Sequence, residues 1–258
     1  MKVHEDYPEV SRARQTQILK LVTNSFYREL VNYGVDDSDI VTVSVHLLDH
    51  ITNKKNPDSN GSEYYNTQFT IKEIEDRWQE ERRLSIQQVT IRPLKPEMIP
   101  TICPWLKAPE VERTLIHFFP KDQVGLRAYL FDRINKLFFG IFHREEELVG
   151  IIGADHIDHR SKKVEMKKLI GNPDYRGKGI GKLATFLFLY YVFMILKFKK
   201  VYIYSMDTNI HNINLNSRFG FELEGILFSE VLVDGVYRDV LRMGLICDDW
   251  QEIFGDSR

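Results

Sequence analysis

Cysteine is scarce in this 258-residue sequence, where Cys103 and Cys247 are the only two and lie far apart. Such a pair excludes a disulfide framework, and no Cys/His spacing typical of a structural zinc site is present. We therefore expect no bound metal. The N-terminal residues, MKVHEDYPEV, also lack the apolar core of a signal peptide. Together these absences predict a reducing, cytoplasmic location.

An excess of charge of one sign is also lacking. The chain has 35 Lys and Arg against 37 Asp and Glu, and its formal net charge is -2. This balance excludes the strongly basic surface of a general nucleic-acid binder. The longest apolar run, residues 183–196, spans about 21 Å as a helix, against about 30 Å of bilayer hydrocarbon. It predicts a buried helix, and no membrane span is expected.

Residues 1–87 form a region of helical pattern. Apolar residues recur at helical spacing over residues 18–30 before Gly34, and a second such helix is predicted over residues 40–51. A polar linker is predicted at 53–68. The T-x-x-E capping box of Thr70 and Glu73 then predicts a charged helix running to Arg83. This helical extension could form a homodimer interface, dock a carrier or protein substrate, or cap an acceptor site.

Residues 88–258 have the pattern of one mixed α/β domain. Strands are predicted at 88–92, 137–143, 148–157, 164–170, 201–206, 226–233 and 236–246. The last two flank Asp234 and Gly235, a favoured two-residue hairpin turn. Helices are predicted twice within 96–134, at 183–196 and at 209–218.

A glycine-rich turn lies between the strand 164–170 and the long apolar helix. Glycines without Cβ atoms let backbone N–H groups face outward, and the N-terminus of the following helix adds a positive dipole. Such a turn binds phosphate. Leu183 stands where a Walker loop needs Ser or Thr, and the glycine spacing does not fit a Rossmann loop. The predicted phosphate-binding residues are Arg176, Gly177, Lys178, Gly179, Ile180, Gly181 and Lys182.

The motif R-x-x-G-x-G at Arg176, Gly179 and Gly181 resembles the acyl-CoA loop of the GNAT superfamily of N-acetyltransferases. Further segments in the same order strengthen the likeness, namely NIHN at 209–212, RFGF at 218–221, ELEG at 222–225 and GVYRD at 235–239. This order is similar to the branch that contains polyamine and ribosomal-protein N-terminal acetyltransferases. The resemblance covers roughly residues 88–248.

The resemblance implies a mixed, mostly antiparallel sheet with flanking helices, whose strands 164–170 and 201–206 splay apart. Acetyl-CoA, as acyl donor, would lie in that gap and meet an amine in a ternary complex, which supplies rate by proximity. Besides the loop, Ile170, Asn209, Asn212 and Arg218 would bind the donor. Asn209 has a second interpretation as a helix N-cap.

The resemblance also nominates catalytic residues. Glu165 is the first candidate for the general base, with an ion pair to Lys167 or Lys163 as the structural alternative. Asp155 and His156 are second candidates. Asn216 stands where many relatives carry a proton-donating tyrosine, and an amide cannot give up a proton to a thiolate. Tyr204, Ser217 or solvent would then protonate CoA.

Three functions stay open. The first is acetyl transfer to a primary amine, namely a polyamine, an amino sugar, an amino-acid-like metabolite or a protein N-terminus. The second is a module that senses acyl-CoA without turnover and binds a protein partner. The third is transfer of longer acyl chains, with the aromatic helix 183–196 lining a tunnel.

Overall fold

The structure, a computed structural model, describes residues 8–32, 34–36, 39–40, 64–112, 114, 118–131, 134–206 and 209–255. The chain divides into two compact units, Met1–Gly61 and Ser62–Arg258. Each unit is described by itself.

The first unit contains the helix α1, Pro8–Asn32. The helix ends at Asn32, two residues before the glycine that the sequence predicts as its stop. Gly34 has a φ of 77°, and its N–H donates to the carbonyl of Val31 at 2.9 Å. The predicted helix beyond residue 40 and the linker up to residue 63 lie outside the described residues.

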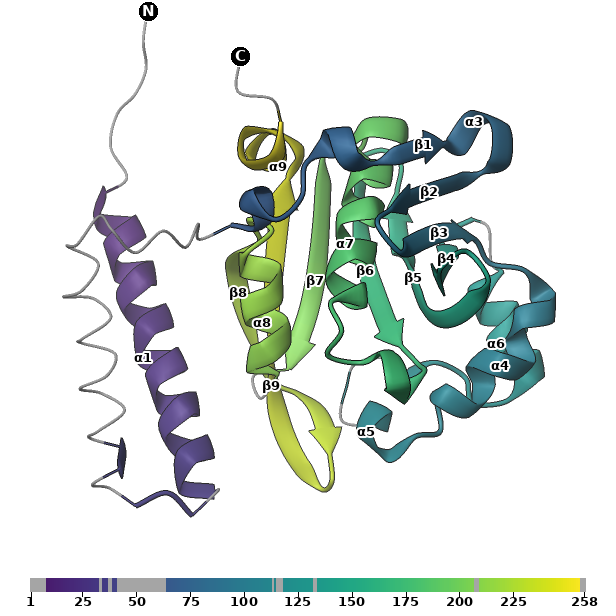
Figure 1. The fold of residues 1–258 in the computed structure, drawn as a ribbon. Helices are drawn as coiled ribbons and strands as arrows, with labels where there is room; N and C mark the ends of the chain where they lie inside the picture. Colours follow the sequence, from purple (N-terminus) through teal and green to yellow (C-terminus); the bar gives the residue numbers. More distant parts are fainter. Residues whose placement is uncertain are drawn as a thin grey trace, which may run out of the picture. The chain divides into compact units, whose positions relative to one another are not determined.

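The second unit is built on a nine-stranded sheet in the order β1-β2-β3-β4-β5-β6-β7-β9-β8 (Figure 1). Among the described strands, β6 and β7 alone run parallel, and every other pair is antiparallel. This confirms the predicted mixed, mostly antiparallel sheet. The strands are β1 (Glu75–Arg77), β2 (Arg83–Ile86), β3 (Val89–Pro93), β4 (Leu137–His143), β5 (Glu147–Asp158), β6 (Lys163–Ile170), β7 (Lys200–Met206), β8 (Glu222–Val233) and β9 (Val236–Ile246).

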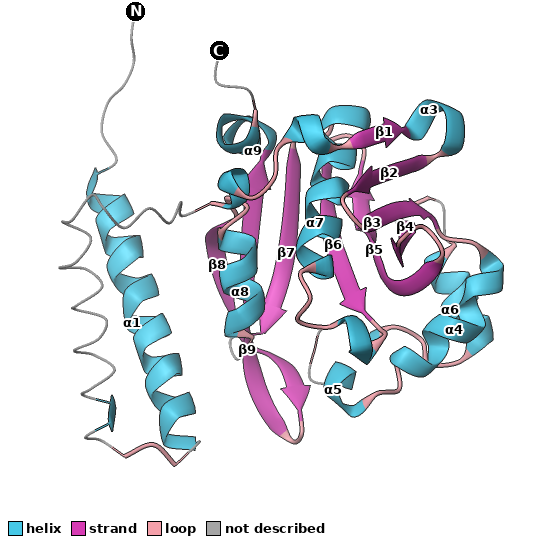
Figure 2. Cartoon of the chain, viewed as in Figure 1, coloured by secondary structure: helices cyan, strands magenta, loops and turns pink. Residues whose placement is uncertain are grey.

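Helices cover both faces of the sheet (Figure 2). On one face, α7 (Ile180–Tyr190), its π-helical continuation (Tyr191–Ile195) and α9 (Cys247–Phe254) pack on the main core, which includes Phe139 and Trp250. On the other face, α4 (Ile99–Trp105) and α6 (Gln123–Leu130) bury Phe138 and Ile151. The remaining short helices are α3 (Trp78–Glu81), α5 (Pro109–Glu112) and α8 (Ile210–Ser217).

The helix predicted from Thr70 to Arg83 is wrong. The capping box forms, but it caps a single 3-10 turn, Ile71–Glu73. The strands β1 and β2 follow, separated by α3, which ends at Arg82 with a left-handed φ of 56°. Leu84 and Ile86 are buried against the sheet, and this tertiary packing overrides the helical spacing of the apolar residues.

The start of the folded unit also differs from the prediction. Residues 64–68, assigned to a linker, lead into the fold, because Tyr65 is buried against Phe69 and Phe219. With β1 and β2 in the sheet, the second unit begins at Ser62 rather than after residue 87.

Candidate functional site

The sheet opens between its two parallel strands. β6 and β7 pair only over Lys163–Glu165 and Lys200–Tyr202, and beyond these residues they diverge, as the family resemblance implies (Figure 1). A cavity of about 110 Å³ lies in this gap. It is lined by Thr114, Met166, Lys167, Lys168, Leu169, Ile203, Tyr204, Ser205, Met206, Asn209, Asn212 and Asn216.

Residues from both faces of the sheet line the gap, because side chains of a strand alternate between the two faces. Lys168 follows Val164 and Met166 onto the α7 face, whereas Lys167 follows Glu165 onto the opposite face. The site therefore has a side toward α7 and α8 and a side toward α4 and α6.

On the α7 side, the glycine loop joins the end of β6 to α7. Gly177 and Gly179 have φ angles of 73° and 80°, which a residue with a Cβ adopts only at a cost. Gly179 caps α7, whose first N–H groups lack intrahelical partners. The predicted loop thus has a left-handed backbone at two positions, which favours the glycines found there.

Arg176 has a different environment from the one its charge suggests. Its Nε donates to the carbonyl of Ile170 at 3.0 Å, and one terminal nitrogen donates to the carbonyl of Gly171 at 3.1 Å. The guanidinium therefore ties the loop to the end of β6, which leaves the backbone N–H groups and the nearby lysines as candidate ligands of a phosphate.

Lys182 and Arg218 form a cationic pair beside the loop. Both lie over the ring of Tyr65, at 5.1 Å and 5.4 Å from its centre, and Lys182 also donates to Gln68. Burial, and then the charge of Arg218, lower the pKa of Lys182. Two cations held this close together favour a shared anion.

Three asparagines form a chain along the α8 wall. Asn209 caps α8 by accepting from the N–H of Asn212 at 3.3 Å, so its capping interpretation is observed. Asn216 is buried and donates to the carbonyl of Asn212 at 2.7 Å, and the Asn212 amide donates to Ser205 Oγ at 3.3 Å. Asn216 Oδ1 is buried and has no hydrogen-bond partner in the described part of the chain.

On the opposite side, Glu165 lies among charged residues. Its carboxylate is buried, 2.9 Å from His156 Nδ1 and in an ion pair with Lys167. The structural alternative, the ion pair with Lys167, is therefore observed, and the role of Glu165 as a base stays a prediction. Lys163 instead faces Asp158 at 3.8 Å.

Asp155 forms a second buried cluster beside Glu165. It accepts from Lys136 Nζ at 2.9 Å, from the His156 N–H at 2.8 Å and from the Tyr129 hydroxyl. Burial acts to raise the pKa of Asp155, but the hydrogen bonds from Lys136 and Tyr129 outweigh it and lower that pKa. The Asp155 carboxylate thus already accepts three hydrogen bonds, which makes it a poor proton acceptor.

The other two candidates for the acid, Tyr204 and Ser217, have different surroundings. Tyr204 lines the gap, but its hydroxyl accepts from Arg242 at 3.3 Å, and that guanidinium lies over the rings of Tyr202 and Tyr204. Ser217 is exposed at the end of α8.

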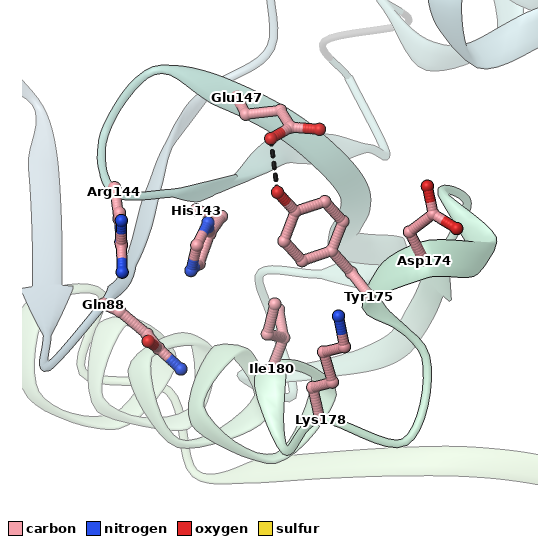
Figure 3. A pocket seen from close by; sticks show the side chains of 8 residues that line it. All are labelled: Gln88, His143, Arg144, Glu147, Asp174, Tyr175, Lys178 and Ile180. Carbon is pink, nitrogen blue, oxygen red and sulfur yellow. Dashed lines mark hydrogen bonds between the residues drawn. The ribbon is translucent and has the colours of Figure 1, made fainter.

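A second pocket, of about 380 Å³, lies beyond the glycine loop (Figure 3). Lys178 faces the ring of Tyr175, 5.4 Å from its centre, and the Tyr175 hydroxyl donates to Glu147. The pocket carries both signs of charge. It is lined by Gln88, His143, Arg144, Glu147, Asp174, Tyr175, Lys178 and Ile180.

Sequence reasoning missed Lys168. Its Nζ donates to Thr185 Oγ1 at 2.7 Å and to the carbonyl of Gly181 at 3.3 Å, directly beneath the glycine loop. The residue is half-buried, and burial of its ammonium group lowers its pKa to about 8. The signal was available, since strand alternation from the core residues Val164 and Met166 places Lys168 on the core face.

Comparisons with known proteins agree with this architecture. Residues 88–222 match the family model described as an acetyltransferase (GNAT) domain. The spermidine N(1)-acetyltransferase of Escherichia coli K12 is 32% identical over 97 residues, or 38% of this chain and 52% of the relative. That of Vibrio cholerae is 29% identical over 108 residues, or 42% and 62% of the two chains.

Solved structures show the same fold. The spermidine N-acetyltransferase from Vibrio cholerae in complex with CoA and spermine has a TM-score of 0.59 and 23% identity, covering 63% of this chain and 98% of that chain. The opened parallel pair and the glycine loop both lie within residues 88–222, which match the acetyltransferase (GNAT) domain. The chain belongs to the GNAT family. It spans about half the length of the Escherichia coli relative that it matches.

Two features are absent from the described residues. No helix there is both apolar and long enough to cross a membrane. In the same residues, no three His, Cys, Asp or Glu side chains gather as ligands for a metal ion.

Proposed function

We propose that the protein transfers an acetyl group from acetyl-CoA to a primary amine by direct attack in a ternary complex. The observation that carries the proposal is the gap between β6 and β7, which is lined by residues from both faces of the sheet and whose Lys168 reaches the glycine loop at the carbonyl of Gly181. An acyl donor on the α7 side and an amine on the opposite side would meet in it.

The donor side has groups suited to each part of CoA. Loop N–H groups at residues 177–181 would hold the pyrophosphate, and the cations of Lys182 and Arg218 would receive phosphate charge. The pantetheine arm carries amide N–H donors, and the unpartnered Asn216 Oδ1 offers one of them an acceptor. Asn209, Asn212 and Ile170 would complete this wall.

On the acceptor side, Glu165 is the proposed base. Its carboxylate contacts His156, whose side chain is 69% exposed, so a proton taken from the amine has a path to solvent. Backbone N–H groups of β6 that face the gap would stabilise the tetrahedral oxyanion. Arg242 and the tyrosines 202 and 204 would shape the entrance for the amine.

The relatives named as spermidine acetyltransferases make polyamines the first acceptors to test. The small volume of the gap favours acetyl over long acyl chains. The buried Asn216, which cannot release a proton, favours a second candidate, an acyl-CoA-binding module without turnover.

The first experiment is a thermal-shift titration with acetyl-CoA, with ATP as control. At about 100 times its dissociation constant a ligand stabilises the folded state by about 2.7 kcal/mol. We expect acetyl-CoA and CoA to raise the melting temperature, and ATP to leave it unchanged. No shift with any acyl-CoA contradicts the proposal.

Thiol release from acetyl-CoA in the presence of spermidine then separates the two candidates. Release shows transfer, whereas a shift without release with any amine favours the binding module. Palmitoyl-CoA in place of acetyl-CoA tests the longer-chain alternative.

A further inference from the structure

The gap contains an ionisable side chain that the proposed transfer does not yet use. The donor's thiol has an ordinary pKa of about 8.5, so a group that gives the leaving sulfur a proton assists breakage of the C–S bond. Among the residues that line the cavity, Lys167, Lys168 and Tyr204 are the ionisable ones.

Two of these three are engaged on the opposite side of the sheet. Lys167 is in an ion pair with the buried Glu165, and Arg242 donates to the Tyr204 hydroxyl. Lys168 alone of the three extends toward α7, where the glycine loop lies.

The geometry points to Lys168 as the residue that protonates the departing sulfur of CoA. The inference rests on the proposed function. Lys168 lines the gap together with Asn212 and Asn216, and its Nζ is held by two neutral oxygens, Thr185 Oγ1 and the carbonyl of Gly181. Thr185 Oγ1 donates to that same carbonyl at 2.8 Å, so it has a lone pair to offer the ammonium.

The neighbours of Lys168 leave its charge uncompensated. Its register partner on β5 is Ile152, α7 presents Thr185, β7 presents Ile203 and Ser205, and α8 presents two asparagines. The nearest charged lining residue, Lys167, belongs to the other face, and Lys182 on α7 is hydrogen-bonded to Gln68. In this neutral setting burial is the cause that brings the pKa of Lys168 down to about 8, close to that of a thiol.

The proposed step is balanced. The amine nitrogen bonds to the thioester carbonyl carbon, and its proton passes to Glu165. The tetrahedral adduct then collapses, the C–S bond breaks with its electron pair on sulfur, and that sulfur takes a proton from Lys168 Nζ. Before the next turnover Glu165 releases its proton to solvent through His156, and the neutral Lys168 regains one from solvent.

The test compares Lys168→Met and Lys168→Arg with the full-length wild type over pH 6–10, using acetyl-CoA and spermidine or another amine that the wild type accepts. Arginine keeps the charge but does not release its proton. Lys163→Met, on the same strand but outside the gap, is the matched control. We expect kcat to fall at least about 10-fold in both Lys168 variants, while their thermal shift with acetyl-CoA is retained.

The pH profile decides between a chemical and a structural role. Wild-type kcat falls as the pH rises through the pKa of Lys168, and the variants lack this alkaline limb. A Lys168→Met protein with wild-type kcat and the same limb overturns the inference, as does full activity in Lys168→Arg. If Lys168→Met does not fold, the Lys168→Arg profile decides alone. A wild type that binds acetyl-CoA but acetylates no amine overturns the proposed function as well.

Discussion

At the scale of single residues, the two buried ionisable groups Asp155 and Lys168 differ in whether a neighbouring charge compensates their own. Asp155 is surrounded by donors, and its charge is compensated by Lys136. Lys168 has hydrogen bonds but no compensating charge on the residues that share its cavity. The first arrangement is typical of a structural ion pair, whereas the second costs stability and is typical of a functional site.

The cost of burying Lys168 predicts a pH-dependent stability. Its pKa is about 8 in the folded protein against an ordinary lysine value of 10.5, so the folded state binds this proton more weakly than the unfolded chain. The penalty is complete below pH 8 and disappears as the pH rises to 10.5. Lys168→Met should therefore stabilise the ligand-free protein by up to about 3 kcal/mol at pH 7 and about 1 kcal/mol at pH 10.

Urea denaturation of the wild type and the variant at the two pH values measures this difference. Lys163→Met controls for the loss of a lysine from the same strand, since Lys163 is 39% exposed. An equal change in the free energy of unfolding by Lys168→Met at both pH values would contradict the proposed cost of burying the charged lysine.

At the scale of elements, the loop before α7 makes different demands on its glycines. Gly179 has a φ of 80°, so alanine there is strained even though space is available. At Gly181 an added Cβ would meet Ile170 at 3.5 Å, an ordinary contact, and its φ is not left-handed. We expect Gly179→Ala to lower the free energy of unfolding by about 1–2 kcal/mol and Gly181→Ala to raise it by up to about 1 kcal/mol.

Chemical denaturation of both variants checks this prediction, and the acetyl-CoA thermal shift reports on the loop itself. We expect the shift to shrink in Gly179→Ala, because the strained backbone turns its N–H groups. Equal stability of the two variants would show that φ at residue 179 is not the constraint.

Elements with strong local signals could be predicted from the sequence. The strand 137–143 and the hairpin at Asp234 and Gly235 agree with β4 and with the β8–β9 turn. The strands within residues 70–86 could not be predicted from the sequence. The spacing of apolar residues there fits a helix, whereas the strand that pairs with β2, namely β3, lies further along the chain. α9 was also missed, and its Trp250 is fully buried in the main core.

At the scale of the whole molecule, the location of the site could be predicted from the sequence, but many of its side-chain contacts could not. The motif at 176–181 located the gap and the loop. The contacts of Arg176 with backbone carbonyls and the cluster of Tyr129 with Asp155 depend on residues brought together by the fold. Tyr65 and Gln68, which meet Lys182, come from sequence before the family match begins.

The short pairing between β6 and β7 also leaves a line of weak strand pairing across the sheet, which we call the seam. Three residue pairs join the block β1–β6 to the block β7–β9–β8. Beyond these three pairs, the backbone amides of β6 and β7 that face the gap have no paired strand opposite them. In the ligand-free protein they should therefore exchange hydrogen for deuterium faster than the amides between β5 and β6. An acyl donor lying along the seam would bind to both blocks at once. Slower exchange of residues 166–170 and 203–206 with acetyl-CoA present would show that the ligand acts as a tenth strand, which completes the sheet only while it is bound.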